Sequence, residues 1–204
     1  MKHIKIRVQS MSLIQISILL MILGVFFGVL FANIFQSSYY DRMMNYHNLV
    51  FTEIVREDID YTGLFLYVLN KNFKEFIVFW LISITILGIP YMIFKLLTLG
   101  FSMGFFISAI AMQYGFKGIL LILSYGFPHG LIYIPLIILC LYKGYSLCVS
   151  IYYDKRNYAG TIMEHIKSNI FVLIFLAVLL LLGSFLEAYV GSFFLKKTLV
   201  FYIN

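Results

Sequence analysis

The chain has 204 residues, of which 62% are hydrophobic and only 12% are charged, against roughly 45–50% and 25% in soluble domains. This composition excludes an ordinary soluble domain, because the apolar residues occur in runs of about 20, the length that crosses roughly 30 Å of hydrocarbon. The net charge of +6 is scattered over chain ends and connections. Without a basic stripe interleaved with aromatic residues, nucleic acid is not an expected partner, and the lipid bilayer is.

The first apolar run covers residues 13–35 and follows Lys2, Lys5 and Arg7. It is too long for the hydrophobic part of a cleaved signal peptide, and it lacks a small-x-small cleavage site. We therefore expect a retained first span with the N-terminus in the cytoplasm, because positively charged flanks stay on that side.

Residues 36–72 form the one long polar stretch and carry both acids and bases. Its apolar residues, such as Val50, Ile54 and Val55, recur at roughly helical spacing. This pattern predicts an extracytoplasmic segment of short amphipathic helices on the outer membrane face, leading into the second span.

The next two apolar runs predict an antiparallel hairpin of spans. We expect the second span over 73–94, with Pro90 near its inner end, and the third over 96–112. Only Lys95 separates them, so the predicted turn is tight.

Small residues repeat every fourth position in two of the spans. Gly100 and Gly104 continue to Ser108 in the third span, and Gly24 and Gly28 have the same spacing in the first. Such spacing places small side chains on one helix face, where another helix backbone can approach closely.

The run over 118–151 contains Gly126-Phe127-Pro128-His129-Gly130. Pro128 removes a backbone donor and two glycines flank it, which predicts a break in the helix. The part before the break is about half the length of a span. We therefore predict a re-entrant half-helix that enters and returns, followed by a fourth span that contains Pro135.

The last apolar run, over 168–190, predicts a fifth span with one acid, Glu187. Five spans and one half-helix would leave the C-terminus outside the cell. Lys196 and Lys197 favour the alternative of six crossings, which would place them inside. The expected fold is an all-α, polytopic membrane helix bundle within one domain over 1–204.

Glu187 and His129 are the residues that suggest chemistry, because ionisable side chains are rare and costly within a span. Glu187 either reaches the interface near its helix end or faces inward to a hydrogen-bonding partner. His129 either supplies hydrogen bonds to the broken helix or meets Glu187 to form a proton or ion site. The residues leave these alternatives open.

Sequence patterns typical of enzymes are missing. The chain has no phosphate-binding glycine loop, no His-Glu-x-x-His pair, no metal-spaced cysteine cluster and no nucleophile-base-acid set on an exposed segment. We therefore expect a protein that is not an enzyme, with no cofactor, catalytic residue or metal site.

From Leu69 onward, the order of landmarks resembles the stage II sporulation protein M family of endospore-forming bacteria. The matching stretches are Asn72-Phe73-Lys74, Leu87-Gly88-Ile89-Pro90, Leu99-Gly100-Phe101-Ser102-Met103-Gly104, Phe127-Pro128-His129-Gly130 with Ile134-Pro135, and Leu186-Glu187-Ala188-Tyr189-Val190. Two positions depart from the wider group, in which an Asn commonly stands at Leu99 and a Glu at Tyr133. The loss of these polar groups argues against ion handling and favours the sporulation branch.

The resemblance implies a non-enzymatic scaffold in the mother-cell membrane, at the sporulation septum and the engulfing membrane. Its implied partners are the stage II sporulation proteins D and P, which degrade peptidoglycan during engulfment. Residues expected to serve structure or partner binding are Gly88, Pro90, Gly100, Gly104, Pro128, His129, Gly130, Pro135 and Glu187. The alternative is a transporter or channel for a small solute or ion that uses the Pro128-His129 break and Glu187. The partner-binding surface and self-association into a homo-oligomer stay open.

Overall fold

The structure is a computed structural model that describes residues 12–152 and 162–203. Within these ranges all regular elements are helices, which confirms the predicted all-α membrane helix bundle. In chain order they are α2 (Leu13–Ile34), α3 (Gln36–Arg56), α4 (Tyr61–Ser83), α5 (Gly88–Tyr114), α6 (Phe116–Tyr152), α7 (Ile162–Phe185), the π-helix η1 (Leu186–Gly191) and α8 (Ser192–Ile203).

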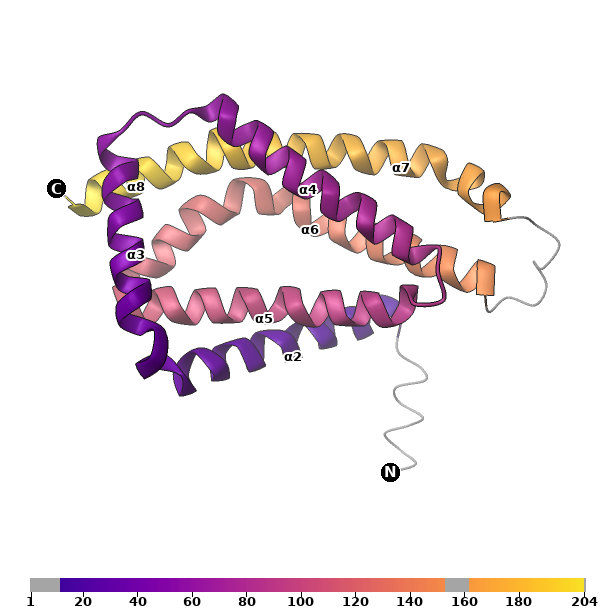
Figure 1. Ribbon diagram of the computed structural model, residues 1–204, viewed down its shortest axis with the longest axis horizontal. Coiled ribbons are helices and arrows are strands. Elements are labelled where there is room, and N and C mark those ends of the chain that lie inside the picture. The colour runs from indigo at the N-terminus through magenta and orange to yellow at the C-terminus, as the bar shows by residue number, and fades with distance from the viewer. Residues whose placement is uncertain (1–11, 153–161, 204) are drawn as a thin grey trace.

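Figure 1 shows α2, α4, α5, α6 and the continuous run of α7, η1 and α8 extending along the long axis, while α3 stands across one end. We call this end the α3 end, and the opposite end, where α4 turns into α5, the turn end. Helix α8 finishes at the α3 end. There, Lys196 Nζ donates to the Glu57 carbonyl at 2.7 Å and lies 3.5 Å from a carboxylate oxygen of Asp58.

Four stretches of the described helices are long and apolar enough to cross a membrane: Leu13–Ile34, Gly88–Tyr114, Phe116–Tyr152 and Asn169–Phe201. Their outward side chains are largely apolar, as Ile22 and Phe26 of α2 illustrate with exposures of 60% and 57%. Helix α4 has 23 residues and runs between the same two ends, but it carries polar side chains at its centre.

The two glycine strips predicted from spacing pack against each other. Gly100 and Gly104 of α5 lie directly against the backbone of α2, where a Cβ at either position would collide with the carbonyl of Met21 or Val25. Gly24 of α2 faces the α5 backbone in the same way. Close helix approach at small residues is therefore used inside the chain, where it joins α2 to α5.

The predicted turn at Lys95 is wrong. Helix α4 continues to Ser83, and α5 begins at Gly88. Thr85 organises the turn, because its hydroxyl donates to the Ile82 carbonyl at 2.7 Å and accepts from a backbone N–H at 3.3 Å. Pro90 is the third residue of α5, where a helix leaves the backbone N–H without a partner, so the proline marks the beginning of this helix and not the end of the preceding one.

The predicted re-entrant half-helix is also wrong. Helix α6 is continuous over 37 residues and contains both Pro128 and Pro135. Figure 1 shows α6 bending and then continuing to the turn end without reversing. A membrane helix tolerates a proline when neighbouring helices and local adjustment satisfy the freed carbonyl. The two glycines beside Pro128 are not packing positions, because a Cβ on Gly126 or Gly130 would meet no atom within 4 Å.

The buried core lies between α4, α5, α6 and α7. Trp80 of α4 is 6% exposed and packs edge-on against Phe79, with ring centroids 5.7 Å apart. The cluster comprises Phe79, Trp80, Met92, Leu96, Leu136, Cys140, Leu141, Leu147, Leu176 and Leu180. This core is apolar, so the polar side chains between the helices are the features that call for an explanation.

Candidate functional site

The acid in the last span, Glu187, faces inward and is held by two tyrosines of α6. The Tyr125 hydroxyl donates to Glu187 Oε1 at 3.0 Å, and the Tyr133 hydroxyl donates to Oε2 at 2.9 Å. Both carboxylate oxygens therefore have donors from a neighbouring helix. Of the two interpretations of Glu187, the structure supports the inward-facing one.

Three further contacts extend this cluster across the bundle. Asn72 Nδ2 of α4 donates to the Tyr133 hydroxyl at 2.6 Å and to Ser184 Oγ at 3.2 Å. Tyr133 and Ser184 also lie within hydrogen-bonding distance, at 3.2 Å. We call Asn72, Tyr125, Tyr133, Ser184 and Glu187 the Glu187 network. It joins α4, α6, α7 and η1, and Ser184 at its centre is fully buried.

Glu187 lies in the π-helix η1, whose wider turns interrupt the regular α-helical ladder. The Ser192 N–H reaches back to the Glu187 carbonyl, five residues earlier. Gly191 allows η1 to approach α6 closely, because a Cβ there would lie 3.1 Å from the Tyr125 carbonyl oxygen. Single π-helical turns inside longer helices are frequent at functional sites.

His129 lies between the two tyrosines that hold Glu187. Its ring centroid is 5.1 Å from that of Tyr125 and 5.6 Å from that of Tyr133, both in edge-to-face orientation. In the part of the chain that the structure describes, its buried Nδ1 has no hydrogen-bond partner. His129 and Glu187 thus share two neighbours, and they are joined through the tyrosines, without a hydrogen bond between them among these residues.

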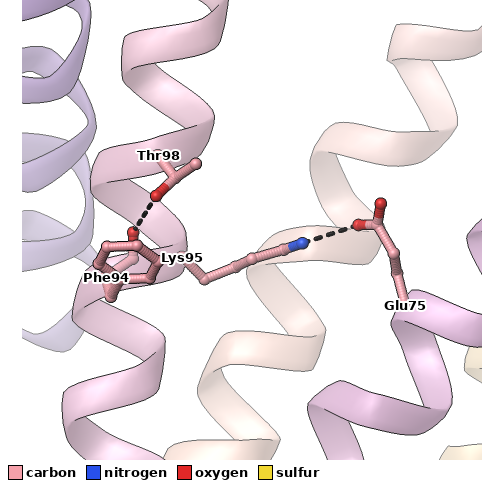
Figure 2. A network of polar contacts seen from close by, with 4 residues as sticks. All are labelled: Glu75, Phe94, Lys95 and Thr98. Carbon is pink, nitrogen blue, oxygen red and sulfur yellow. Dashed lines mark hydrogen bonds and ion pairs between the residues drawn. The ribbon is translucent and has the colours of Figure 1, made fainter.

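A cavity of about 270 Å³ adjoins the Glu187 network on the side of the turn end. Asn72 and Tyr133 line it together with Glu75 and Lys95, and most of the remaining lining is apolar. Figure 2 shows Lys95 reaching from α5 to Glu75 of α4, where Nζ and Oε2 are 2.7 Å apart. The side chains of Lys95 and Glu75 are 37% and 52% exposed, so this ion pair lies at the edge of the bundle.

The structure brings together only two of the nine residues predicted for structure or partner binding, His129 and Glu187. The glycines Gly100 and Gly104 are buried against α2. Gly88 is buried where α5 begins, with a Cβ position 3.0 Å from Cys148 Sγ. The other four, Pro90, Pro128, Gly130 and Pro135, are helix residues away from the carboxylate-tyrosine contacts.

Chemically, the Glu187 network is a carboxylate that accepts hydrogen bonds from two tyrosine hydroxyls. One of them, the Tyr133 hydroxyl, also contacts Asn72 and Ser184. Such a cluster can hold a proton or position helices, but it contains no activated nucleophile. Within residues 12–152 and 162–203, no group of three or more His, Cys, Asp or Glu side chains could hold a metal ion.

Comparison with known families adds the decisive observation. The family model described as stage II sporulation protein M matches residues 17–192. The chain belongs to the stage II sporulation protein M family. No curated protein and no solved structure matches the chain.

The resemblance noted from motif order is therefore confirmed, and this member of the stage II sporulation protein M family is a sporulation membrane protein. The family is not known as an enzyme family. The stretches that carried the resemblance lie at different places in the structure. Asn72, His129 and Glu187 lie in or beside the Glu187 network. Gly88 lies at the start of α5, and Gly100 lies in the contact between α5 and α2.

Sequence reasoning missed most of the Glu187 network and the Glu75–Lys95 pair. Tyr125, His129 and Tyr133 are spaced by four residues, which places them on one face of a helix. That signal becomes visible only when α6 is treated as continuous, because a break at Pro128 separates Tyr125 from the other two.

Proposed function

We propose that this protein is a non-enzymatic membrane scaffold of the sporulation engulfment machinery, which recruits and localises peptidoglycan-degrading partners at the septal membrane. Its location would be the mother-cell membrane, with the α3 end facing outside because α2 begins at the turn end and Lys2, Lys5 and Arg7 precede it in the sequence. The implied partners are the stage II sporulation proteins D and P.

The observation that carries the proposal is α3, a polar helix that stands across one end of an apolar bundle. None of its residues is buried, and charged side chains such as Asp41, Arg42 and Glu53 are exposed. A wall hydrolase works outside the membrane, so a scaffold needs a surface there. Helix α3 supplies one at the proposed outer face.

Contacts with two other helices hold α3 in place. His47 Nδ1 lies 2.8 Å from Gln113 Oε1 at the end of α5, and the nearby Tyr114 hydroxyl donates to Asn48 Oδ1 at 3.2 Å. Lys196 of α8 contacts the residues that directly follow α3. A surface fixed at several points loses little freedom when a partner binds, which favours recruitment.

The test is affinity purification of the tagged, full-length protein from sporulating cells. We expect the stage II proteins D and P to copurify, and expect the variant E53K/E57K to weaken their recovery because it reverses two exposed charges of this surface. The variant K197Q, which alters an exposed residue of α8, is the matched control. Normal engulfment in a strain that lacks the protein would overturn the proposal.

A second candidate function, transport of a small solute or ion, is favoured by one specific observation. The Glu187 network adjoins the cavity at Asn72 and Tyr133, so polar groups and an open volume meet within the bundle. Flux through vesicles that contain the purified protein tests this function. We would expect E187Q to abolish the flux, and a flux that is absent from wild-type vesicles or indifferent to E187Q would exclude it.

A further inference from the structure

Helix α4 presents an exposed polar face about halfway along its length. Tyr67, Asn70, Lys71 and Lys74 are all exposed and follow the spacing of one helix face. We call these four residues the α4 outer face. The opposite side of α4 carries Asn72, which points into the Glu187 network.

The two lysines of this face lie far from the helix ends. Lys71 comes ten residues after the start of α4 and twelve before its end, or about 15 Å and 18 Å along the helix axis. Lysine side chains reach the membrane interface when they lie near helix ends, whereas a mid-span lysine exposed to lipid is strongly unfavourable. A membrane-embedded α4 therefore requires a polar neighbour at this depth.

The charges of this face are uncompensated. In the described part of the chain, Lys71 and Lys74 have no ion pair, and the nearest acid of α4, Glu75, is paired with Lys95 at 2.7 Å. The α4 outer face therefore carries two positive charges near the middle of α4. The chemistry that complements it is an acidic side chain at the same depth.

We propose that the α4 outer face binds a transmembrane helix of a partner protein that carries an Asp or Glu side chain near its middle. This inference deepens the proposed scaffold function and rests on it, because it adds a recruiting surface within the membrane to the one at α3. A second copy of this chain is not the occupant. A symmetric contact would bring Lys71 and Lys74 against themselves, and Glu187 is enclosed by its own tyrosines.

The experiment measures binding of two probe peptides to the purified full-length protein in phosphatidylcholine bilayers, by energy transfer between labels. One probe is a leucine-rich span of about 20 residues with a central Asp, and the other has Asn at that position. We expect the Asp probe to bind about tenfold more tightly. The variant K71Q/K74Q should lose this preference, and K197Q, which changes an exposed lysine of α8, should keep it.

A charge reversal keeps the proposal falsifiable if K71Q/K74Q is poorly folded. In K71E/K74E the preference should move to a third probe with a central Lys. Equal binding of the Asp and Asn probes to the wild type, or an Asp preference that persists in a folded K71Q/K74Q, overturns the proposal. A preference that disappears when the bilayer contains phosphatidylglycerol also overturns it, because Lys71 and Lys74 then reach anionic headgroups at the interface and do not need an acid at mid-depth.

These outcomes are separable from failure of the scaffold function. If the stage II proteins D and P copurify with both the wild type and K71Q/K74Q, partner binding by the α4 outer face is refuted and the scaffold function stands. If neither protein copurifies with the wild type while the Asp probe keeps its preference, the scaffold assignment fails and the binding surface stands as a property of the chain.

Discussion

Replacing Tyr133 by Phe tests whether the Glu187 network stabilises the bundle as a connected unit. The hydroxyl of Tyr133 donates to Glu187, accepts from Asn72 and lies beside Ser184. Its bond to the carboxylate is worth about 1.5–3 kcal/mol, and the two others about 0.6 kcal/mol each, the average for hydrogen bonds between membrane helices. Y133F should therefore lower the free energy of unfolding by about 3–4 kcal/mol.

The matched comparison is Y125F. The Tyr125 hydroxyl makes a single bond to the same carboxylate, at 3.0 Å. Y133F should therefore cost about 1 kcal/mol more than Y125F, which is the sum of the two weaker contacts. Unfolding can be followed by titration with SDS in mixed micelles. The single tryptophan, Trp80, is buried in the core and reports on its packing through fluorescence.

A double-mutant cycle separates the network from simple packing. In an E187M background, which removes both acceptors, Y133F should cost only about 1 kcal/mol, because the carboxylate bond is already lost. The coupling between Tyr133 and Glu187 should then be about 1.5–3 kcal/mol. If Y133F costs the same in both backgrounds, to within about 0.5 kcal/mol, the two residues act independently and the reasoning fails.

Two other contacts give further predictions, measured by the same titration. G104A should destabilise the protein by about 1–3 kcal/mol, because the new Cβ collides with the α2 backbone, whereas G126A should be neutral or stabilising because its Cβ meets no atom within 4 Å. K95E should destabilise the α4–α5 contact through repulsion with Glu75, and the swapped pair E75K/K95E should recover most of the loss, about 1 kcal/mol for an ion pair this exposed. Equal effects of G104A and G126A, or a swap no better than K95E, would contradict these contacts.

The length of the apolar runs was enough to predict the helix bundle, and the spacing of small residues predicted two helix faces that another helix backbone can approach closely, but not that these faces pack on each other. Gly100 and Gly104 repeat at four residues, as do Gly24 and Gly28, and the structure packs one pair of strips against the other. This prediction succeeded because the period of a helix determines which residues share a face, whatever the rest of the fold.

Prolines were misinterpreted because each allows more than one structure. Pro90 ends a helix or opens one, and the structure uses it to open α5. Pro128 predicts a break when only the local sequence is considered, but a helix surrounded by other helices can continue through a proline, as α6 does. The local sequence does not contain the neighbouring helices that decide between these outcomes.

The misplaced turn also concealed the Glu75–Lys95 pair. With a turn at Lys95, the two residues would lie at opposite ends of one span and could not meet. With the observed turn after Ser83, they face each other across the hairpin, 2.7 Å apart. An error in one predicted helix boundary thus hides the contact between two residues, even though both are charged and lie in apolar surroundings.

Helix α4 shows why averaged hydropathy is a poor guide to a helix of this kind. Each residue is rotated by about 100° from the one before it, so Asn72 points away from Lys71, while Glu75, four residues after Lys71, lies about 40° from it at the border of the same face. Asn72 enters the Glu187 network, Glu75 reaches α5, and Lys71 stays on the outer face. A window average merges them into one weakly apolar segment. Taken separately, two of these residues tie α4 to its own bundle, while Lys71 is left for a neighbour outside it.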